Sequence, residues 1–410
     1  MIIRPYEPER DKDAARRIYR EVGWLASGEE ESVEQMMSVC RVMVGEVNGS
    51  AEALAQTTSG TLRYLDHDLI FAGVTAVATS RIARQQGLAL RVTARVLAED
   101  AAEGAHVAGL SMFDQGYYNR IGFGTGSYEH QVRFDPSQLN LSVKPRVPGR
   151  ITPDDWKEAH AARLAGMRPH GSCTLRPPET TRAEMGWTKN GFGLGYRDAP
   201  GGAISHYIWC GASNIEEGPY RVAWMAYRTY DELLELLAML RSLGDQVTAV
   251  SMVEPPGIQL QDLMHRPFRH ARITQDSSRA IGIRSWAWWQ MRICDLPGAL
   301  EHTHLPGSDQ VRFNLCLSDP IEGYLGDDAP WRGIGGEYVV TLGPSSGAER
   351  GRDETLPTLE ATVNAFTRLW LGVRPATGLA VTDRLDGPAE LLRRLDETLR
   401  VPQPRLDWEF

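Results

Sequence analysis

Three short stretches decide the fold that the sequence predicts. They read Val74-Thr-Ala-Val-Ala-Thr79, Arg84-Gln-Gln-Gly87-Leu-Ala89 and Tyr117-Tyr-Asn-Arg-Ile-Gly-Phe-Gly124. The first stretch is rich in β-branched residues and predicts a buried strand that ends in a turn. The second opens a long helical pattern. A helix N-terminus carries unpaired N–H groups and the positive end of the helix dipole, so this junction is a natural seat for an anion.

The residue types at the junction fit a phosphate group. Gly87 and Ala89 have little or no side chain, so a pyrophosphate could approach the backbone closely, and Arg84 would add positive charge. The pattern Arg-x-x-Gly-x-Ala is weak by itself, and the alternative is a helix start that packs against a strand. The order strand, turn, motif, helix, strand and aromatic-glycine segment favours the binding site.

This order resembles motif A of the GNAT N-acetyltransferases, in which the loop cradles the pyrophosphate of acetyl-CoA. The segment from Tyr117 to Gly124 is similar to the Y-x-x-x-G-F/Y segment that lies beside the thioester in that family. The resemblance implies that the strand predicted over residues 69–79 diverges from its neighbour. The pantetheine arm of acetyl-CoA would enter the gap.

Composition sets the broad class of the protein. The chain has 410 residues, which is enough for about two or three domains. Its formal charge of -9 disfavours a nucleic-acid partner and favours cationic small molecules. Five widely spaced cysteines without a C-x-x-C pair indicate neither a disulfide framework nor a zinc site. Without a signal-peptide pattern or an apolar run long enough to span a membrane, we expect a cytoplasmic protein.

The beginning of the chain follows the order that is usual for GNAT domains, a short strand and then a helix over residues 11–22. A second helix is predicted over residues 27–40, and helices in this position often form a wall of the acceptor site. Trp24 and the acidic residues 29–31 would then meet a cationic substrate. A solvated acidic helix start is the alternative for the glutamates.

The rest of the first domain alternates strands with one long helix. The predicted strands cover residues 42–47, 58–64, 69–79, 107–113 and 130–134, the last of which finishes the domain, and the predicted helix covers residues 86–103.

A second, related order follows the linker at residues 144–151. A capping box, Thr229-x-x-Glu232, begins a helix over residues 233–243 between predicted strands. It stands where the Arg-x-x-Gly-x-Ala loop would be, so we expect a degenerate copy that does not bind acetyl-CoA. A third region opens near residue 290, with strands over 311–317 and 336–342 and helices over 359–369 and 388–399.

Over essentially the whole chain this layout resembles the Eis family (enhanced intracellular survival proteins). The matching pieces are Val77-Ala-Thr79 with Arg84-Gln-Gln-Gly87, Tyr118-Asn-Arg-Ile-Gly-Phe123, Arg292-Ile-Cys-Asp-Leu-Pro297 and an aromatic last residue, Phe410. The resemblance implies an α/β chain with mixed sheets. It would comprise an active GNAT domain (1–147), a degenerate GNAT-like domain (148–288) and a C-terminal α+β domain similar to sterol carrier protein (289–410). The end of that last domain would reach the active site. Family members form homo-oligomers, often hexamers.

The resemblance also implies roles for single residues. Backbone groups of Val77 and Thr79 would hold the pantetheine, and the pyrophosphate loop would comprise Arg84, Gln85, Gly87 and Leu88. Tyr118 would be the general acid that protonates the departing thiolate. The terminal carboxylate at Phe410 would be the general base, for which its pKa must rise from about 3.5. Substrate contacts would come from Trp24, Trp408 and Glu409. The alternative for Phe410 is a frayed chain end, and for Trp408 and Glu409 it is a solvated tail.

Three residues depart from the pattern of that family. Arg81 stands where many members have proline, and Gln85 and Gln86 replace arginines that are common there. The loop therefore carries less positive charge, although its backbone N–H groups remain available for the pyrophosphate.

Two functions of different classes stay open. The first is acetyl transfer from acetyl-CoA to primary amines of an aminoglycoside-like or polyamine-like molecule, or to lysine side chains, a reaction that needs no metal. The second is a non-catalytic ligand carrier or interaction protein that uses its C-terminal domain. The intact loop and Tyr118 favour the first. The sequence does not define the acceptor, the oligomer size or whether the C-terminal domain binds a lipid.

Overall fold

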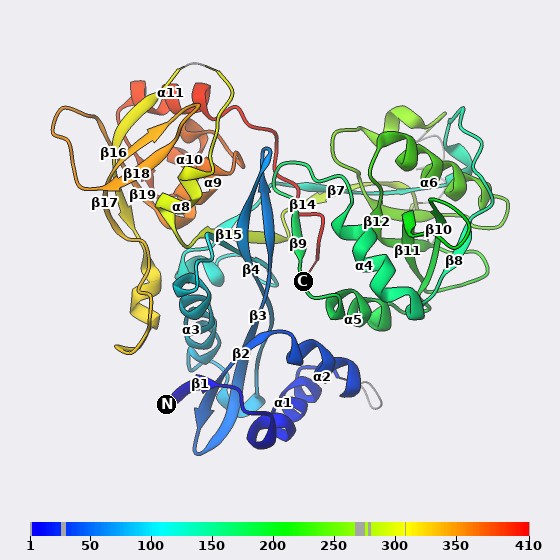
Figure 1. The fold of residues 1–410 in the computed structure, drawn as a ribbon, viewed down its shortest axis with the longest axis horizontal. Coiled ribbons are helices and arrows are strands. Elements are labelled where there is room, and N and C mark those ends of the chain that lie inside the picture. Colours follow the sequence, from blue (N-terminus) through cyan, green and yellow to red (C-terminus); the bar gives the residue numbers. More distant parts are fainter. Residues whose placement is uncertain (1, 26–29, 267–274, 278–279, 308, 410) are drawn as a thin grey trace. The chain divides into compact units, whose positions relative to one another are not determined.

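The structure, a computed structural model, describes residues 2–25, 30–266, 275–277, 280–307 and 309–409 (Figure 1). The chain folds into two compact units. The first comprises Met1–Ser127, Pro169–Pro177 and Ala287–Phe410, and the second comprises Tyr128–Arg168 and Pro178–Trp286. Both contain mixed sheets, as the sequence predicted, and the first unit combines distant parts of the chain.

An eight-stranded sheet forms one part of the first unit. Its strands are, in spatial order, β1 (Ile2–Pro5), β2 (Arg41–Val47), β3 (Ser50–Tyr64), β4 (His67–Thr79), β5 (Val107–Ser111), β15 (Trp289–Ile293) and β6 (Gly124–Thr125), with β9 (Cys173–Leu175) paired to β3. The strands β4 and β5 are parallel, and their neighbours pair with them in antiparallel fashion.

Helices cover both faces of this sheet. One face carries α1 (Pro8–Glu21) and α2 (Glu30–Ser38), and the other carries α3 (Leu88–Ala102). The alternation of side chains along β3 explains this arrangement. Leu54 is buried in a cluster with residues of α1 and α2, whereas Ala53 and Ala55 are buried in a cluster with residues of α3.

Two strand predictions for this region were wrong. The strand predicted over residues 58–64 begins at Ser50, because Asn48 and Gly49 adopt positive φ values and form a tight hairpin turn. The strand predicted over residues 130–134 does not finish the first sheet. It is β7 (Glu129–Phe134) of the second unit, and β15, far along the chain, pairs with β5 in its place.

A five-stranded sheet forms the C-terminal part of the first unit. Its spatial order is β18 (Gly347–Arg350), β17 (Gly336–Leu342), β16 (Val311–Ser318), β19 (Thr358–Thr362) and β20 (Leu385–Asp386). The accompanying helices are α8 (Leu296–Glu301), α9 (Val363–Trp370), α10 (Ala376–Thr382) and α11 (Ala389–Thr398). The helix predicted from residue 359 begins only at Val363, where the Thr362 hydroxyl accepts a hydrogen bond from the N–H of Ala365.

One continuous apolar core joins this part to the first sheet. A single buried cluster contains Phe71 of β4, Trp289 of β15, Phe313 of β16 and Phe366 of α9. Because both sheets share this core, the N-terminal and C-terminal parts of the chain belong to one compact unit.

The second unit is built on a seven-stranded sheet. Its spatial order is β14 (Gly282–Trp286), β7, β13 (Val250–Val253), β12 (Tyr220–Ala226), β11 (Ile204–Ala212), β10 (Phe192–Arg197) and β8 (Gly149–Ile151). Its helices in the described residues include α4 (Trp156–Leu164), α5 (Glu179–Trp187) and α6 (Tyr230–Ser242). As predicted, Thr229 caps α6 through a hydrogen bond from the N–H of Glu232.

The predicted division into three domains stays a prediction. The first compact unit contains most of the predicted first domain (1–147) together with the predicted last domain (289–410). In the described part of the chain, no helix has the length and apolar character that crossing a membrane requires.

Candidate functional site

The first feature of the site is a divergence between two parallel strands. The ladder between β4 and β5 pairs Phe71 with Val107 and ends at Val74 and Leu110. β4 continues to Thr79, still paired with β3 on its other side. Residues 75–79 therefore present one backbone edge that β5 does not pair, which includes the predicted Val77 and Thr79.

A bulge lies where the strands separate. The pairing of β3 with β4 shifts between Leu54 and Gln56, so that Ala55 opposes two residues of β4. One of these, Ala76, has a φ of 48°, a left-handed conformation that is unusual for a residue with a side chain. The bulge bends β4 away from β5 and opens the edge beyond Val74.

The loop between β4 and α3 contains two residues in the left-handed conformation. Gln85 and Gly87 both have positive φ values, 62° and 73°, and Gly87 is the N-cap of α3. Within the described part of the chain no side chain caps this helix, and its first turn contains no acidic residue. The first N–H groups of α3 therefore keep their capacity to bind an anion. A side chain at Gly87 would meet no atom within 4 Å, so the space beside it is open.

Arg81 and Gln86 have local structural roles in this loop. The backbone N–H of Arg81 donates a hydrogen bond of 2.7 Å to Glu21 Oε2 at the end of α1, a bond that proline could not make. The side-chain amide of Gln86 donates to the carbonyl of Ile82 over 3.1 Å and closes the loop on itself. The side chains of Arg84 and Gln85 are exposed.

Tyr118 lies in a short 3₁₀ turn (Tyr118–Ile121) that is followed by Gly122. Its ring is buried in one cluster with Val74, Leu90 and Leu110, and Val77 packs against this cluster. The ring meets Phe113 and Phe123 edge to face, at centroid distances of 5.9 and 6.2 Å. The structure therefore brings Tyr118 to the end of the β4–β5 ladder, and its role as a general acid stays a prediction.

Burial raises the pKa of the Tyr118 hydroxyl above its ordinary value, and the neighbouring Tyr117 adds to the shift. Among the described residues, the Tyr118 hydroxyl has no hydrogen-bond partner. A phenol in this state keeps its proton at neutral pH and can donate it to an incoming group.

The C-terminal tail runs along the segment that leads into β9 (Figure 1). The N–H of Arg405 donates to the carbonyl of His170 over 3.0 Å, and the N–H of Cys173 donates to the carbonyl of Leu406 over 3.0 Å. The hydroxyl of Ser127 donates to the carbonyl of Pro404 over 2.6 Å. Hydrogen bonds therefore tie residues 404–406 to the first unit.

The predicted substrate residues have different environments. Trp24 is exposed and stacks on the buried Tyr19 at a centroid distance of 6.2 Å. Trp408 is buried in a core cluster different from that of Tyr118, and Glu409 is exposed. The structure does not join these three residues in one cluster. Phe410 lies outside the described residues, so its role as a base stays a prediction.

Three buried polar residues that the sequence did not single out as site residues hold the Tyr118 turn. They are Gln290, Arg292 and Asn364, each nine-tenths or more buried and each bonded to the turn or to the residues just after it. The matching piece that begins at Arg292 was the only signal in the sequence for any of them.

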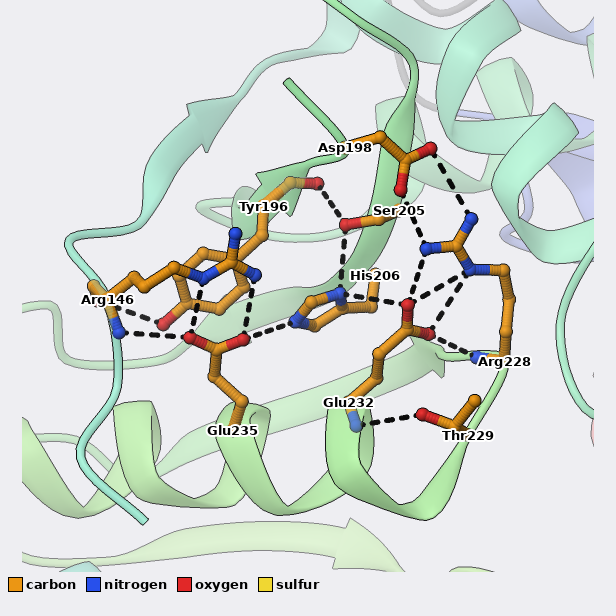
Figure 2. Close-up of polar contacts among 9 residues, drawn as sticks. All are labelled: Arg146, Tyr196, Asp198, Ser205, His206, Arg228, Thr229, Glu232 and Glu235. Carbon is orange, nitrogen blue, oxygen red and sulfur yellow. Dashed lines mark hydrogen bonds and ion pairs between the residues drawn. The ribbon is translucent and has the colours of Figure 1, made fainter. Parts of the chain in front are cut away.

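The second unit has a comparable junction that its own side chains fill (Figure 2). β12 and β13 are parallel over two residue pairs only, and α6 follows β12. Here the hydroxyl of Thr229 and the carboxylate of Glu232 occupy the helix N-terminus, and Arg228 donates to Glu232. Arg146 holds the pKa of the nearby Glu235 at about 2, so a second negative charge persists. This junction is unfavourable for an anion.

Among the described residues, no group of three histidine, cysteine or carboxylate side chains could hold a metal ion.

Comparison with solved structures identifies the fold over the full length of the chain. The similar proteins include Eis1 from Mycobacterium abscessus (17% identity, TM-score 0.76) and a GCN5-related N-acetyltransferase from Anabaena variabilis (13% identity, TM-score 0.79), each covering 100% of both chains. A third, from Enterococcus faecalis, is described as a probable N-acyltransferase (19% identity, TM-score 0.79) and covers 100% of this chain and 99% of its own.

This chain has the fold of GCN5-related N-acetyltransferases. No protein-family model matches the sequence, and no curated protein matches it either. The fold likeness therefore rests on structure, at identities too low to carry residue roles with it.

His170 accepts a hydrogen bond from the tail through its backbone carbonyl, and its imidazole is buried between two other backbone groups. Its Nδ1 accepts from the N–H of Leu65, and its Nε2 donates to the carbonyl of Leu371, both over 3.0 Å. Burial lowers the pKa of His170 to about 4. Between pH about 6.5 and about 4, His170 is protonated in the unfolded chain but neutral in the folded chain. Acidification through this range should therefore reduce the free energy of unfolding by up to about 3 kcal/mol.

Urea denaturation at pH 7 and pH 4.5 measures this loss. The variant His170→Gln should lose less stability on acidification than the wild type, because its amide does not titrate. His67→Gln, at a more exposed histidine, is the control for the substitution itself. Equal acid losses in the wild type and His170→Gln would contradict the prediction.

Proposed function

We propose that this chain is an acetyl-CoA-dependent N-acetyltransferase of the Eis type, which transfers acetyl to primary amines. One observation carries the proposal. The unpaired edge of β4 beyond Val74 leads directly into a loop whose two left-handed residues, Gln85 and Gly87, precede an uncapped helix. A backbone edge followed by an anion seat suits a donor that combines an amide-containing arm with a pyrophosphate.

The residues present fit acetyl-CoA. Backbone groups of Val77 and Thr79 would pair with the pantetheine arm, because the pairing of β4 with β5 ends before these residues. The N–H groups of Gln85, Gly87 and Leu88 would bind the pyrophosphate, with charge from Arg84. The side chain of Leu88 is buried, so only its backbone is available for this contact.

Tyr118 would act as the general acid. The attacking amine nitrogen forms a bond to the thioester carbonyl carbon, and the carbon–sulfur bond then breaks. The Tyr118 hydroxyl, which is protonated at neutral pH, gives its proton to the departing sulfur. The proton lost by the amine passes to a base, for which we propose the terminal carboxylate at Phe410. The ordered tail at residues 404–406 supports this assignment.

The acceptor would be a cationic amine such as an aminoglycoside or a polyamine, or a lysine side chain, as the net charge of -9 favours. Trp24 and Glu409 would contact it from exposed positions, and the buried Trp408 would support the tail. The division into an active domain (1–147), a degenerate domain (148–288) and a sterol-carrier-like domain (289–410), and a homo-oligomer, are parts of the same proposal.

The anion seat can be tested with two glycines at opposite ends of one helix. Gly87 and Gly104 flank α3, both have positive φ values, and neither would bring a Cβ within 4 Å of another atom. Gly87→Val and Gly104→Val should each cost about 1–2 kcal/mol of stability. Only Gly87→Val should weaken acetyl-CoA binding, by about 10-fold or more, because it blocks the backbone approach.

Isothermal titration calorimetry with acetyl-CoA distinguishes the two variants. Equal affinities for Gly87→Val and Gly104→Val would show that the loop does not bind the donor.

The acid role is tested by removing one oxygen atom. Tyr118→Phe keeps the packed ring and should lower kcat by about 100-fold, with KM for acetyl-CoA changed by less than about 3-fold. Tyr117→Phe is the matched control at the adjacent, half-buried ring and should leave kcat within about 3-fold of the wild type. The assay is the release of free thiol with kanamycin, spermidine and a lysine peptide.

The same assay tests the base with a chain that is extended beyond Phe410, since the extension moves the carboxylate away. Unchanged turnover after the extension would remove the terminal carboxylate from the mechanism. A wild-type kcat in Tyr118→Phe would remove the acid.

A further inference from the structure

The segment that carries Tyr118 is held by side chains from the distant C-terminal part of the chain. The side-chain amide of Asn364, in the first turn of α9, donates two hydrogen bonds of 2.8 Å. One goes to the carbonyl of Asn119 and the other to the carbonyl of Phe123. A single buried amide therefore joins both ends of residues 119–123, the stretch that directly follows Tyr118.

A buried guanidinium holds the middle of the same stretch. Arg292 of β15 is fully buried, donates to the carbonyl of Ile121, and forms an ion pair of 2.7 Å with Asp319. Gly122 has a φ of 91°, and a Cβ there would lie 2.7 Å from Arg292 Nη1. Only glycine lets the backbone approach the guanidinium this closely.

A third contact fixes the side chain that follows Tyr118. The amide of Gln290, also fully buried, donates to Asn119 Oδ1 over 2.8 Å and to Thr125 Oγ1 over 3.2 Å. Asn119 Oδ1 also accepts from the N–H of Gly116 over 3.0 Å. The bonds thus reach both sides of Tyr118.

The Tyr118 hydroxyl itself has no partner among the described residues, so nothing holds that oxygen directly. Its position depends on the ring packing and on the backbone that these three side chains fix. We propose that Asn364 is the principal positioning residue for Tyr118, with Arg292 and Gln290 in support. This inference rests on the proposed function, and it makes the C-terminal part of the chain obligatory for the acid step.

The chain offers a matched pair of variants for the test. Asn364→Asp is isosteric and replaces the donor to two carbonyls by an acceptor. Because a buried carboxylate beside two carbonyl oxygens is costly even in the first turn of a helix, thermal melting must show that this variant folds. Asn314→Asp is the control: Asn314 is also buried and also donates to two carbonyls, those of Asp353 and Leu356 over 2.8 and 3.0 Å, but it does not contact the Tyr118 segment.

Steady-state kinetics with acetyl-CoA and spermidine or kanamycin give the readout. Asn364→Asp should lower kcat by about 10- to 100-fold while KM for acetyl-CoA stays within about 3-fold, and Asn314→Asp should leave kcat within about 3-fold of the wild type. Asn364→Ser keeps one donor and should retain an intermediate kcat. Thermal melting of all variants separates lost folding from lost positioning.

A double-mutant cycle separates positioning from a general loss of structure. If Asn364 acts through Tyr118, adding Asn364→Asp to Tyr118→Phe should lower kcat no further, within about 2-fold. Multiplied losses, or an unchanged kcat in Asn364→Asp and Asn364→Ser, would overturn the inference while the acid role of Tyr118 stands. A Tyr118→Phe variant with wild-type kcat, or a wild-type protein without turnover, would instead overturn the proposed function and the inference with it.

Discussion

The unpaired edge of β4 is the constraint on which the site depends. A strand edge with no partner leaves backbone N–H and C=O groups that need either water or a ligand. The bulge at Ala76 produces this edge within the sheet. β4 is paired with β5 as far as Val74, and only the residues after Val74 lose that neighbour. The loop at Gln85 and Gly87 then places an uncapped helix at the end of the edge. An extended anionic ligand would satisfy both at once.

The first sheet also depends on a part of the chain far away in sequence. β15 pairs with β5 and β6, and the same strand carries Gln290 and Arg292 toward the Tyr118 segment. α9 adds Asn364, and the tail adds its bonds at His170 and Cys173. The C-terminal part therefore completes the N-terminal sheet, shares its core and fixes the backbone beside the proposed acid.

The sequence predicted the local features of the site well, because they depend on local chemistry. The helix at Gly87, the strand that ends at Thr79 and the turn at Tyr118 follow from glycine conformation and periodicity. The sequence did not predict that β7 leaves the first sheet or that β15 enters it, because neighbouring strands in space need not be neighbours in the chain. Asn364 was missed for the same reason, because its partners Phe123 and Asn119 lie 241 and 245 residues away in the sequence.

Amide hydrogen exchange with and without acetyl-CoA tests the central claim most directly. We predict slower exchange on binding at residues 75–79 and 85–90, where the open edge and the helix start would pair with the donor. The corresponding junction of the second unit, residues 222–232, should exchange at the same rate in both conditions. Protection at residues 222–232, or none at residues 75–79 and 85–90, would contradict the claim that the edge of β4 receives the donor.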